Sequence, residues 1–160
     1  MVDTDAAFAT DYQKKSVGFS MIVFGSEDGS TLFMLLDWNM NVQGILAMSS
    51  MGAEIIEQSS CGQGALVVLQ ILEQRGWDLS PYVAFCDNSA GVTVLSEAQN
   101  FKKSGHILRH YYHVRDMKEN GILKFIWIST KEMLADFNTK FNIPVKVFLE
   151  QISKVLQIGE

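Results

Sequence analysis

The sequence predicts a single α/β domain in which helices cover both faces of a mixed sheet. Three segments with strand-like composition come first, at residues 1–7, 17–24 and 31–38. Helical and strand-like segments then alternate to the C-terminus, which is typical of a sheet that also contains parallel strands. The chain has 160 residues, 48% of them hydrophobic, and this is enough for one domain with a substantial core.

The first three segments are expected to pair as antiparallel neighbours. Residues 11–15 form a polar turn, and residues 26–29 (Ser-Glu-Asp-Gly) have the composition of a hairpin turn. A further polar turn is predicted at residues 39–43, followed by an extended or irregular stretch at residues 44–48. The three strands would then lie at one side of the sheet.

A long helix is predicted to begin near Ser49 and Ser50 and to end at Gly76. Its apolar face is formed by residues that recur at helical spacing, namely Cys61, Ala65, Val68 and Leu72. Gly62 and Gly64 interrupt this helix at a cost of roughly 1 kcal/mol each relative to alanine. We therefore expect a bend or an unusually close contact at these glycines.

The next strand, at residues 82–86, ends directly before Asp87. Its apolar composition predicts a strand buried on both faces, as in a parallel sheet. Asn88 and Ser89 are good helix N-cap residues, and residues 90–98 are compatible with a helix. An acid at the carboxyl end of a buried strand lies where open α/β sheets hold their ligands. The alternative is that Asp87 only caps the helix.

The remaining elements alternate in the same way. A basic loop at residues 102–105 precedes a polar helix at residues 106–119 and a strand at residues 122–128. Ser129 and Glu132 have capping-box spacing, so a short helix is expected to begin there. A final helix is predicted from Pro144. Its buried stripe would consist of Val145, Phe148, Leu149, Ile152, Val155 and Leu156.

Charge and composition exclude some classes of protein. The net charge of −5 argues against a strong autonomous nucleic-acid binder, although clustered carboxylates can hold metal ions that meet a phosphate. The sequence contains no run of about 18 uncharged apolar residues, so no membrane-spanning helix is predicted. The acidic start of the chain is unlike a signal peptide, and Cys61 and Cys86 lie in apolar segments without metal-ligand spacing. These features predict an intracellular protein with reduced cysteines.

Four acids stand at the edges of predicted elements: Asp5, Glu54, Asp87 and Asp136. Taken singly, each has an ordinary explanation. Glu54 would interact favourably with the dipole of its helix, and Asp136 could lie on a solvated surface. Taken together, they could converge above the sheet and bind hard divalent cations. Two such ions roughly 4 Å apart can support phosphodiester cleavage. Spacing alone does not establish that the four side chains meet.

From about Asp5 to Lys140, the chain resembles the ribonuclease H domain of copia-type LTR retrotransposon polyproteins. The resemblance lies in several blocks that keep their order and spacing. These blocks are Thr4–Asp11, Asp37–Gln43, Ser49–Ile55, Phe85–Gly91, His106–Asp116 and Ser129–Lys140. The last block and Cys86-Asp87-Asn88 are fairly specific to that family.

The resemblance implies a ribonuclease H-like fold: a five-stranded mixed sheet with helices on both faces, the first three strands antiparallel and strands 1, 4 and 5 parallel. One domain would span residues 1–160, with a core of about 1–140 and a C-terminal helix at about 144–158. The metal-binding, catalytic tetrad would be Asp5, Glu54, Asp87 and Asp136, with Asp5 and Asp87 bridging two Mg²⁺ ions that Mn²⁺ can replace. The implied reaction is hydrolysis of the RNA strand of an RNA–DNA hybrid.

The resemblance also implies partners and a location. The partners would be the RNA–DNA hybrid and an adjoining reverse transcriptase domain, and the location would be the cytoplasm, the nucleus or virus-like particles. Residues expected to contact the substrate are either in matching blocks or in the chain's basic concentration. They are Asn88, Ser89, Trp38, Lys102, Lys103, Arg109 and Arg115. A plain solvated surface is the alternative for the basic residues.

Two other hypotheses stay open. Asn39, Asn41 and Val42 stand where the family has lysines, which favours a catalytically silent ribonuclease H-like module with a structural or binding role. A transposase or integrase core on the same fold has less support, because the blocks after His106 follow the ribonuclease H order. His106, His110 and His113 lie close in sequence, but no fourth ligand completes a zinc site. We expect them on a polar helix surface near the substrate.

Overall fold

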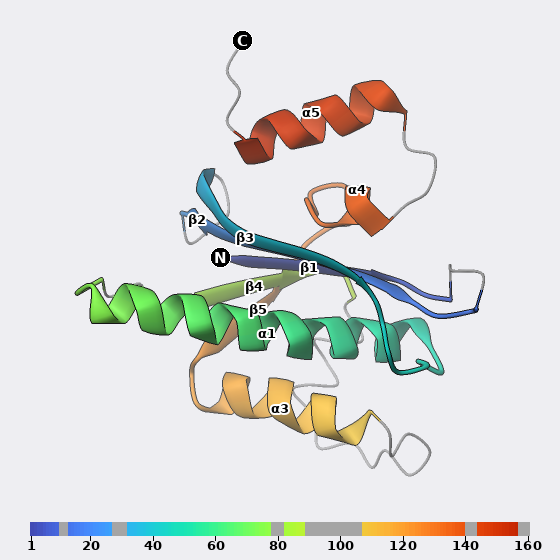
Figure 1. The fold of residues 1–160 in the computed structure, drawn as a ribbon, viewed down its shortest axis with the longest axis horizontal. Helices are drawn as coiled ribbons and strands as arrows, with labels where there is room; N and C mark the ends of the chain where they lie inside the picture. The colour runs from blue at the N-terminus through green and yellow to red at the C-terminus, as the bar shows by residue number, and fades with distance from the viewer. Residues whose placement is uncertain (10–12, 27–31, 78–81, 89–106, 140–143, 157–160) are drawn as a thin grey trace.

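A computed structural model of the chain describes residues 1–9, 13–26, 32–77, 82–88, 107–139 and 144–156 (Figure 1). Its strands are β1 (Val2–Ala7), β2 (Val17–Gly25), β3 (Leu32–Val42), β4 (Tyr82–Cys86) and β5 (Leu123–Trp127). Its helices are α1 (Ser50–Gln74), α3 (Leu108–Glu119), α4 (Asp136–Thr139) and α5 (Val145–Leu156). The predicted helix at residues 90–98 and the basic loop at residues 102–105 lie outside the described residues, as do residues 27–29 of the hairpin turn predicted at 26–29.

The five strands form one mixed sheet in the order β3-β2-β1-β4-β5. β1, β2 and β3 pair as antiparallel neighbours, whereas β4 is parallel to both β1 and β5. The sheet therefore has the strand directions that the resemblance implied. The first strand of the chain lies at the centre of the sheet, with β2 on one side and β4 on the other.

Helices cover both faces of the sheet, as predicted (Figure 1). α1 and α3 lie on one face, and α4 and α5 lie on the other. The main apolar core lies under α1 and α3 and includes Ile55, Tyr111 and Val114. A smaller core on the α4 face contains Phe19, Met21, Val23, Cys86, Met133 and Ala135. Within the described ranges, no helix is long and apolar enough to cross a membrane.

α1 begins and ends where the sequence predicts. The Ser49 hydroxyl accepts a hydrogen bond from the Gly52 N–H at 3.1 Å, which caps the helix N-terminus. At the other end, Gly76 adopts a positive φ of 81°, which suits glycine after a helix. The predicted close contact occurs at Gly62, where an added Cβ would lie 2.4 Å from Cε of Met117 on α3.

The polar turn predicted at residues 39–43 is wrong, because β3 continues to Val42. Asn39 pairs with Ser20 and Asn41 pairs with Gly18 on β2. Met40 and Val42 alternate with these asparagines, so the segment has the period of a strand with one polar face. Pairing with a long neighbouring strand outweighs the low intrinsic strand preference of asparagine.

The short helix expected at Ser129 is also wrong, since α4 begins only at Asp136. Residues 129–135 form turns, in which the Ser129 carbonyl accepts the N–H of Glu132 at 2.8 Å. The N–H of Leu134 is bound by the Asp3 side chain at 2.9 Å. A contact with the first strand therefore takes the N–H that a continuous helix would use.

The final helix begins after Pro144 as predicted, but its predicted buried stripe is not buried at its start. Val145, Phe148 and Leu149 are 71%, 37% and 56% exposed. The helix contacts the edge strand β3 and stands farther from the sheet than α4 (Figure 1). Its amphipathic period predicts the helix correctly, but it does not fix how closely the helix packs.

Candidate metal centre

Asp5, Asp87 and Asp136 come together from three separate elements. One carboxylate oxygen from each lies within 4.8 Å of one from each of the others. Asp5 lies on β1, and Asp87 directly follows the parallel neighbour β4. The carboxyl ends of neighbouring parallel strands meet at the same edge of a sheet, which explains why these two acids are close. Asp136 is the first residue of α4 and approaches from the covering layer.

Side chains from the C-terminal part of the chain hold two of these acids. The Thr139 hydroxyl donates a hydrogen bond to Oδ2 of Asp5, 134 residues away in sequence. The Thr130 hydroxyl donates to Oδ2 of Asp87 at 2.8 Å, and Nε1 of Trp127 donates to the Asp87 backbone carbonyl at 2.8 Å. The end of β4 is therefore tied to β5 and to the loop that follows it.

Glu54, the fourth predicted acid, lies past the first turn of α1, rather than within it as predicted, and outside the group of three. It is only 6% exposed, and its Oε2 has no hydrogen-bond partner among the described residues. Burial raises the pKa of Glu54 to about 9, and the nearby charges of Asp5, Asp87 and Glu57 act in the same direction. Glu54 is thus electrostatically coupled to the other acids although it stands outside their group of three.

Crowding of acids also affects Asp5. Burial raises the pKa of Asp5 above its ordinary value, and the charges of Asp87 and Asp136 raise it further. The hydrogen bond from Thr139 opposes this rise because it stabilises the carboxylate. Such a cluster repels itself when fully ionised, so its ionised form requires positive charge nearby.

The chemistry of these side chains fits hard divalent cations. Every donor is a carboxylate oxygen, which is the ligand type that Mg²⁺ and Mn²⁺ prefer. Three such oxygens lie within 4.8 Å of one another, and a fourth carboxylate, that of Glu54, is buried with an unpartnered oxygen. The geometry therefore makes Asp5, Asp87 and Asp136 a candidate cation site, with Glu54 buried outside the group of three.

Glu57 is a buried acid that the sequence analysis missed. It follows Glu54 by one helical turn and is 1% exposed, packed so closely on β2 that an added Cβ at Gly18 would lie 1.7 Å from its Oε2. Burial raises the pKa of Glu57 to about 7, and the polar side chains of Ser20 and Gln43 oppose this rise. Its spacing of three residues from Glu54 is the only sequence signal that could have drawn attention to it.

Asp3 is a second buried acid that was missed. Its side chain is 2% exposed, and its Oδ2 accepts the N–H of Leu134 at 2.9 Å. Burial raises the pKa of Asp3 to about 7, while the N–H groups of Leu134 and Ala135 lower it and the charges of Asp5 and Asp87 raise it. Its two-residue spacing from Asp5 places both side chains on the same face of β1.

The predicted substrate contacts are spread over both faces of the sheet. Trp38 is 62% exposed on β3, and its ring lies 6.4 Å from that of Phe19, on the α4 face. Arg109 and Arg115 lie on α3, which covers the opposite face. Asn88 follows Asp87 and is partly buried. Ser89, Lys102 and Lys103 lie outside the described residues.

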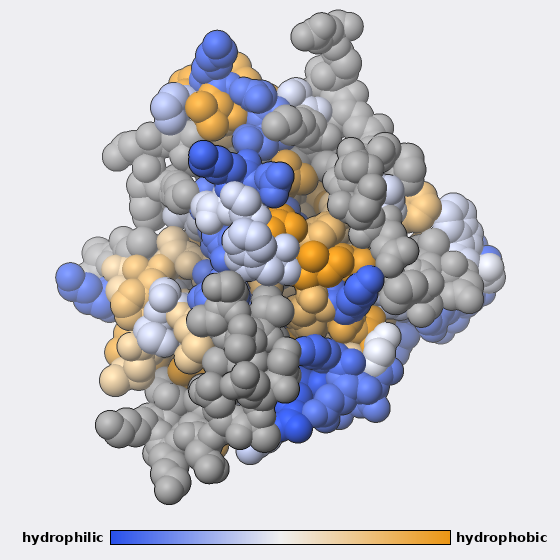
Figure 2. Space-filling model, turned by 180° about the vertical axis from the view of Figure 1, so that it is seen from behind, coloured by the Kyte–Doolittle hydropathy of each residue, from blue (hydrophilic) through white to orange (hydrophobic). Residues whose placement is uncertain are grey.

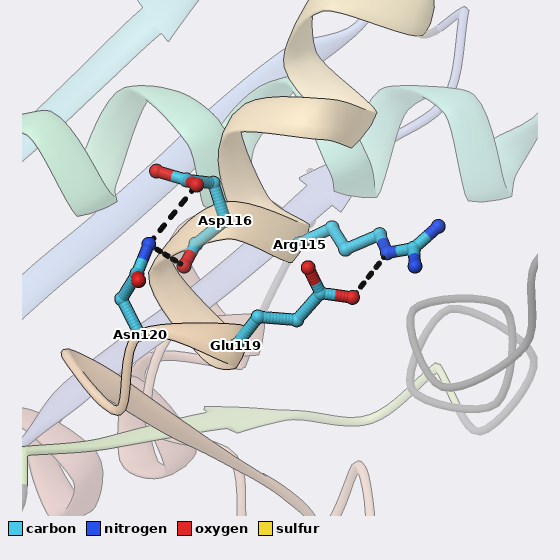
Figure 3. Close-up of polar contacts among 4 residues, drawn as sticks. All are labelled: Arg115, Asp116, Glu119 and Asn120. Carbon is cyan, nitrogen blue, oxygen red and sulfur yellow. Dashed lines mark hydrogen bonds and ion pairs between the residues drawn. The ribbon is translucent and has the colours of Figure 1, made fainter.

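The charge of Arg115 is partly neutralised within α3. Its Nε donates to Oε1 of Glu119 at 2.6 Å, one helical turn away, as the close-up shows (Figure 3). Beside it, Nδ2 of Asn120 donates to the backbone carbonyl and the side chain of Asp116, both at 3.0 Å (Figure 3). Glu119 therefore places negative charge beside Arg115, which reduces the attraction of Arg115 for a phosphate.

The histidines of α3 have a structural contact. Nδ1 of His110 and Nδ1 of His113 each lie 3.0 Å from the Ser59 hydroxyl on α1. Ser59 is 2% exposed, so this contact joins the two helices beneath the sheet. His106 lies outside the described residues. The predicted polar surface therefore includes a buried contact that the sequence did not reveal.

Seen from behind, the molecule presents an apolar area near its centre, bordered by hydrophilic side chains above and below (Figure 2). Trp127, at the end of β5, is one of the exposed apolar side chains of the protein, at 53%. Its indole binds the Asp87 carbonyl, so an exposed aromatic ring adjoins the acidic cluster. Aromatic rings next to a site of this kind can stack on bases or pack on sugars.

The sequence has relatives among transposon polyproteins. It is 27% identical over 138 residues to a retrovirus-related Pol polyprotein from transposon TNT 1-94 of Nicotiana tabacum. It is 26% identical over 106 residues to the one from transposon RE2 of Arabidopsis thaliana. These matches cover 86% and 66% of the chain, but only 10% and 7% of the respective polyproteins. No family model matches the sequence.

Solved structures decide the fold. The chain superposes on the N-terminal RNase H domain of Rv2228c from Mycobacterium tuberculosis, with a TM-score of 0.58 at 11% identity, covering 86% of this chain and 92% of that one. RNase H1 from Halobacterium salinarum gives the same TM-score, identity and coverage of this chain, with 91% of the archaeal chain covered. The chain has the ribonuclease H fold.

The two comparisons are consistent with each other and with the predicted resemblance. The sequence relatives are retrotransposon Pol polyproteins, and the structural neighbours are ribonuclease H domains. The chain thus combines the ribonuclease H fold with sequence similarity to transposon Pol polyproteins. Within this fold, the three clustered aspartates lie at the carboxyl ends of β1 and β4 and at the start of α4.

Proposed function

We propose that this domain is a metal-dependent endonuclease that hydrolyses the RNA strand of RNA–DNA hybrids. It would be part of, or derived from, the polyprotein of a copia-type retrotransposon and would act inside the cell. The observation that carries the proposal is the convergence of Asp5, Asp87 and Asp136 within 4.8 Å in a ribonuclease H fold. Three carboxylates at this distance repel one another unless cations neutralise them.

Two Mg²⁺ ions, or Mn²⁺ in their place, would be held by these aspartates and by Glu54. When bound, such ions supply an activated water and stabilise the departing 3′ oxygen of the RNA strand. The protein side chains fix the geometry. Thr139 orients the Asp5 carboxylate, and Thr130 orients that of Asp87. Such outer contacts limit the rotation of ligand side chains before the metal binds.

The proposed substrate is a hybrid duplex, and the proposed partner is an adjoining reverse transcriptase domain. The support is that the sequence relatives are Pol polyproteins of which this chain spans about a tenth or less. With a net charge of −5 and Arg115 paired to Glu119, the domain itself supplies little positive surface. A neighbouring domain would then contribute much of the affinity for the phosphate backbone.

Cleavage of a labelled RNA–DNA hybrid tests the proposal. The protein is incubated with the hybrid in Mg²⁺ or in Mn²⁺, with Asp87→Asn as the control, because this change removes one carboxylate charge and keeps the side-chain shape. Cuts confined to the RNA strand, and absent in the control, are expected. A folded protein that leaves the hybrid intact in both metals would instead favour the catalytically silent module.

A further inference from the structure

Asp3 lies two residues before Asp5 on β1 and faces the same side of the sheet. Its carboxylate accepts the N–H of Leu134 at 2.9 Å, across 131 residues of sequence. This contact links the central strand to the segment that leads into α4 and Asp136. None of the matching sequence blocks includes Asp3, and its role follows only from the structure.

Asp3 is poorly explained as a residue that only stabilises the fold. It is 2% exposed, beside apolar neighbours such as its cross-strand partner Met21. Its Oδ1 has no hydrogen-bond partner among the described residues, and the charges of Asp5 and Asp87 are close enough to oppose its ionisation. An apolar side chain would avoid both costs. The position therefore calls for another reason to hold a carboxylate.

The short segment from Leu134 to Thr139, which carries Asp136, is bound at both ends by aspartates of β1. At its beginning, the Leu134 N–H is bound by Asp3, and at its end the Thr139 hydroxyl is bound by Asp5. Asp136 lies between these two ties. Residues 129–135 form turns rather than a regular helix, so contacts with other elements fix the position of the chain as it enters the short helix α4. Two aspartates of β1 thus hold both ends of the segment that carries Asp136.

We propose that Asp3 is a positioning residue, whose bond to the Leu134 N–H keeps the Asp136 carboxylate within reach of Asp5 and Asp87. The proposal rests on the proposed function, since it assumes that these three carboxylates bind divalent cations. Asp3 itself touches neither metal nor substrate in this account. Its effect passes through the backbone of residues 134–136.

Matched substitutions at Asp3 test the proposal. Asp3→Asn keeps an oxygen that accepts the Leu134 N–H but loses the charge, whereas Asp3→Leu has the same branched shape, with bulkier methyl groups, and no acceptor. Asp3→Val is a second apolar variant with a higher strand preference, in case the leucine variant does not fold. For each protein, Mn²⁺ affinity is measured by calorimetry, the Leu134 amide by hydrogen exchange and the fold by its melting temperature.

The expected pattern separates position from stability. In the apolar variants, the Leu134 amide should exchange at least tenfold faster, and Mn²⁺ should bind about tenfold more weakly, the lower end of losses typical when a group supporting a metal ligand is removed. Their melting temperature should be equal to or above that of the wild type. Asp3→Asn should restore both protection and affinity to within about threefold of the wild type. A simple loss of charge would instead affect all three variants alike.

Asp87→Asn distinguishes the two proposals. If this control abolishes Mn²⁺ binding while the apolar Asp3 variants bind as the wild type does, the positioning role is overturned and the proposed function stands. If the wild type shows no Mn²⁺ binding that depends on Asp87, the proposed function is overturned together with this inference. An unprotected Leu134 amide in the folded wild type overturns the positioning role without any variant.

Discussion

The Thr130 hydroxyl lies 2.8 Å from Oδ2 of Asp87 and joins the loop after β5 to the end of β4. We expect Thr130→Val, which keeps the shape but removes the donor, to weaken Mn²⁺ binding about fivefold. This corresponds to about 1 kcal/mol, a typical net value for one hydrogen bond. Thr130→Ser keeps the hydroxyl and should bind like the wild type. Equal Mn²⁺ affinity of the valine and serine variants in calorimetry would contradict this role.

A second prediction concerns protons released when the metal binds. Because burial and the nearby acids raise the pKa of Glu54 to about 9, this side chain is protonated at neutral pH in the metal-free protein. A cation that takes Glu54 as a ligand must displace that proton, so binding should release about one proton and tighten as the pH rises towards 9.

Calorimetric titrations of Mn²⁺ in buffers with different ionisation enthalpies measure this release. Glu54→Gln has no proton to lose at this position, so its heat of binding should depend much less on the buffer. A wild-type binding heat that is the same in every buffer would mean that Glu54 is not a ligand.

The third prediction concerns the pH dependence of stability. Glu57 has a pKa raised by burial from 4.5 to about 7, so the folded state binds its proton more tightly than the unfolded state does. The stabilisation is fully present below pH 4.5 and is lost as the pH rises through 7. Over this range, the free energy of unfolding should fall by up to about 1.4 kcal/mol per pH unit from this group alone.

Urea denaturation of the metal-free protein between pH 5 and pH 8 provides the measurement. Glu57→Gln mimics the protonated side chain, so its stability should decline less steeply with pH than that of the wild type. Since Asp3 and Glu54 titrate in both proteins, only the difference between the two slopes reports on Glu57. Parallel slopes would show that Glu57 does not contribute.

The two glycines of α1 allow a matched test of packing. An added Cβ at Gly62 would lie 2.4 Å from Cε of Met117, which is 1% exposed and has little room to move. At Gly64, the nearest atom would be Cδ1 of Ile22 at an ordinary 3.7 Å. Both changes to alanine gain helix propensity, worth about 1 kcal/mol, but only Gly62→Ala overpacks the core.

We therefore expect Gly64→Ala to raise the melting temperature of the protein and Gly62→Ala to be less stable than Gly64→Ala by about 1–3 kcal/mol. Thermal and urea denaturation of the two variants measure the difference. If they prove equally stable, the contact between α1 and α3 at Gly62 is looser than the structure indicates.

Local patterns in the sequence were sufficient where an element is decided by its own residues. The strand Tyr82–Cys86 has the predicted bounds, because its apolar run ends sharply at Asp87. The cap at Ser49 and the positive φ of Gly76 likewise depend on the residue types at the two ends of α1. These features depend on neighbours in sequence, which a single sequence displays directly.

Features decided by distant contacts were not predicted. Asn39 and Asn41 lie in a strand because β2 pairs with them, and Leu134 lies in a turn because Asp3 binds its N–H. The candidate site is intermediate in this respect. The resemblance indicated its four acids, but not the supporting contacts of Asp3, Glu57, Thr130 and Thr139. They became apparent only once the structure placed them beside residues more than forty positions away or beneath a neighbouring strand.

The central position of β1 has a consequence for the order in which the protein assembles during synthesis. Among the strands of this domain, β1 leaves the ribosome before the others, and β2 and β3 can pair with it as soon as they emerge. The other side of β1 stays open until β4 is made, and the ties from Thr130, Leu134 and Thr139 must wait until nearly the whole described chain has been released. A nascent domain thus has a hairpin early and three gathered aspartates only at the end, so the acidic cluster would form last, after most of the sheet.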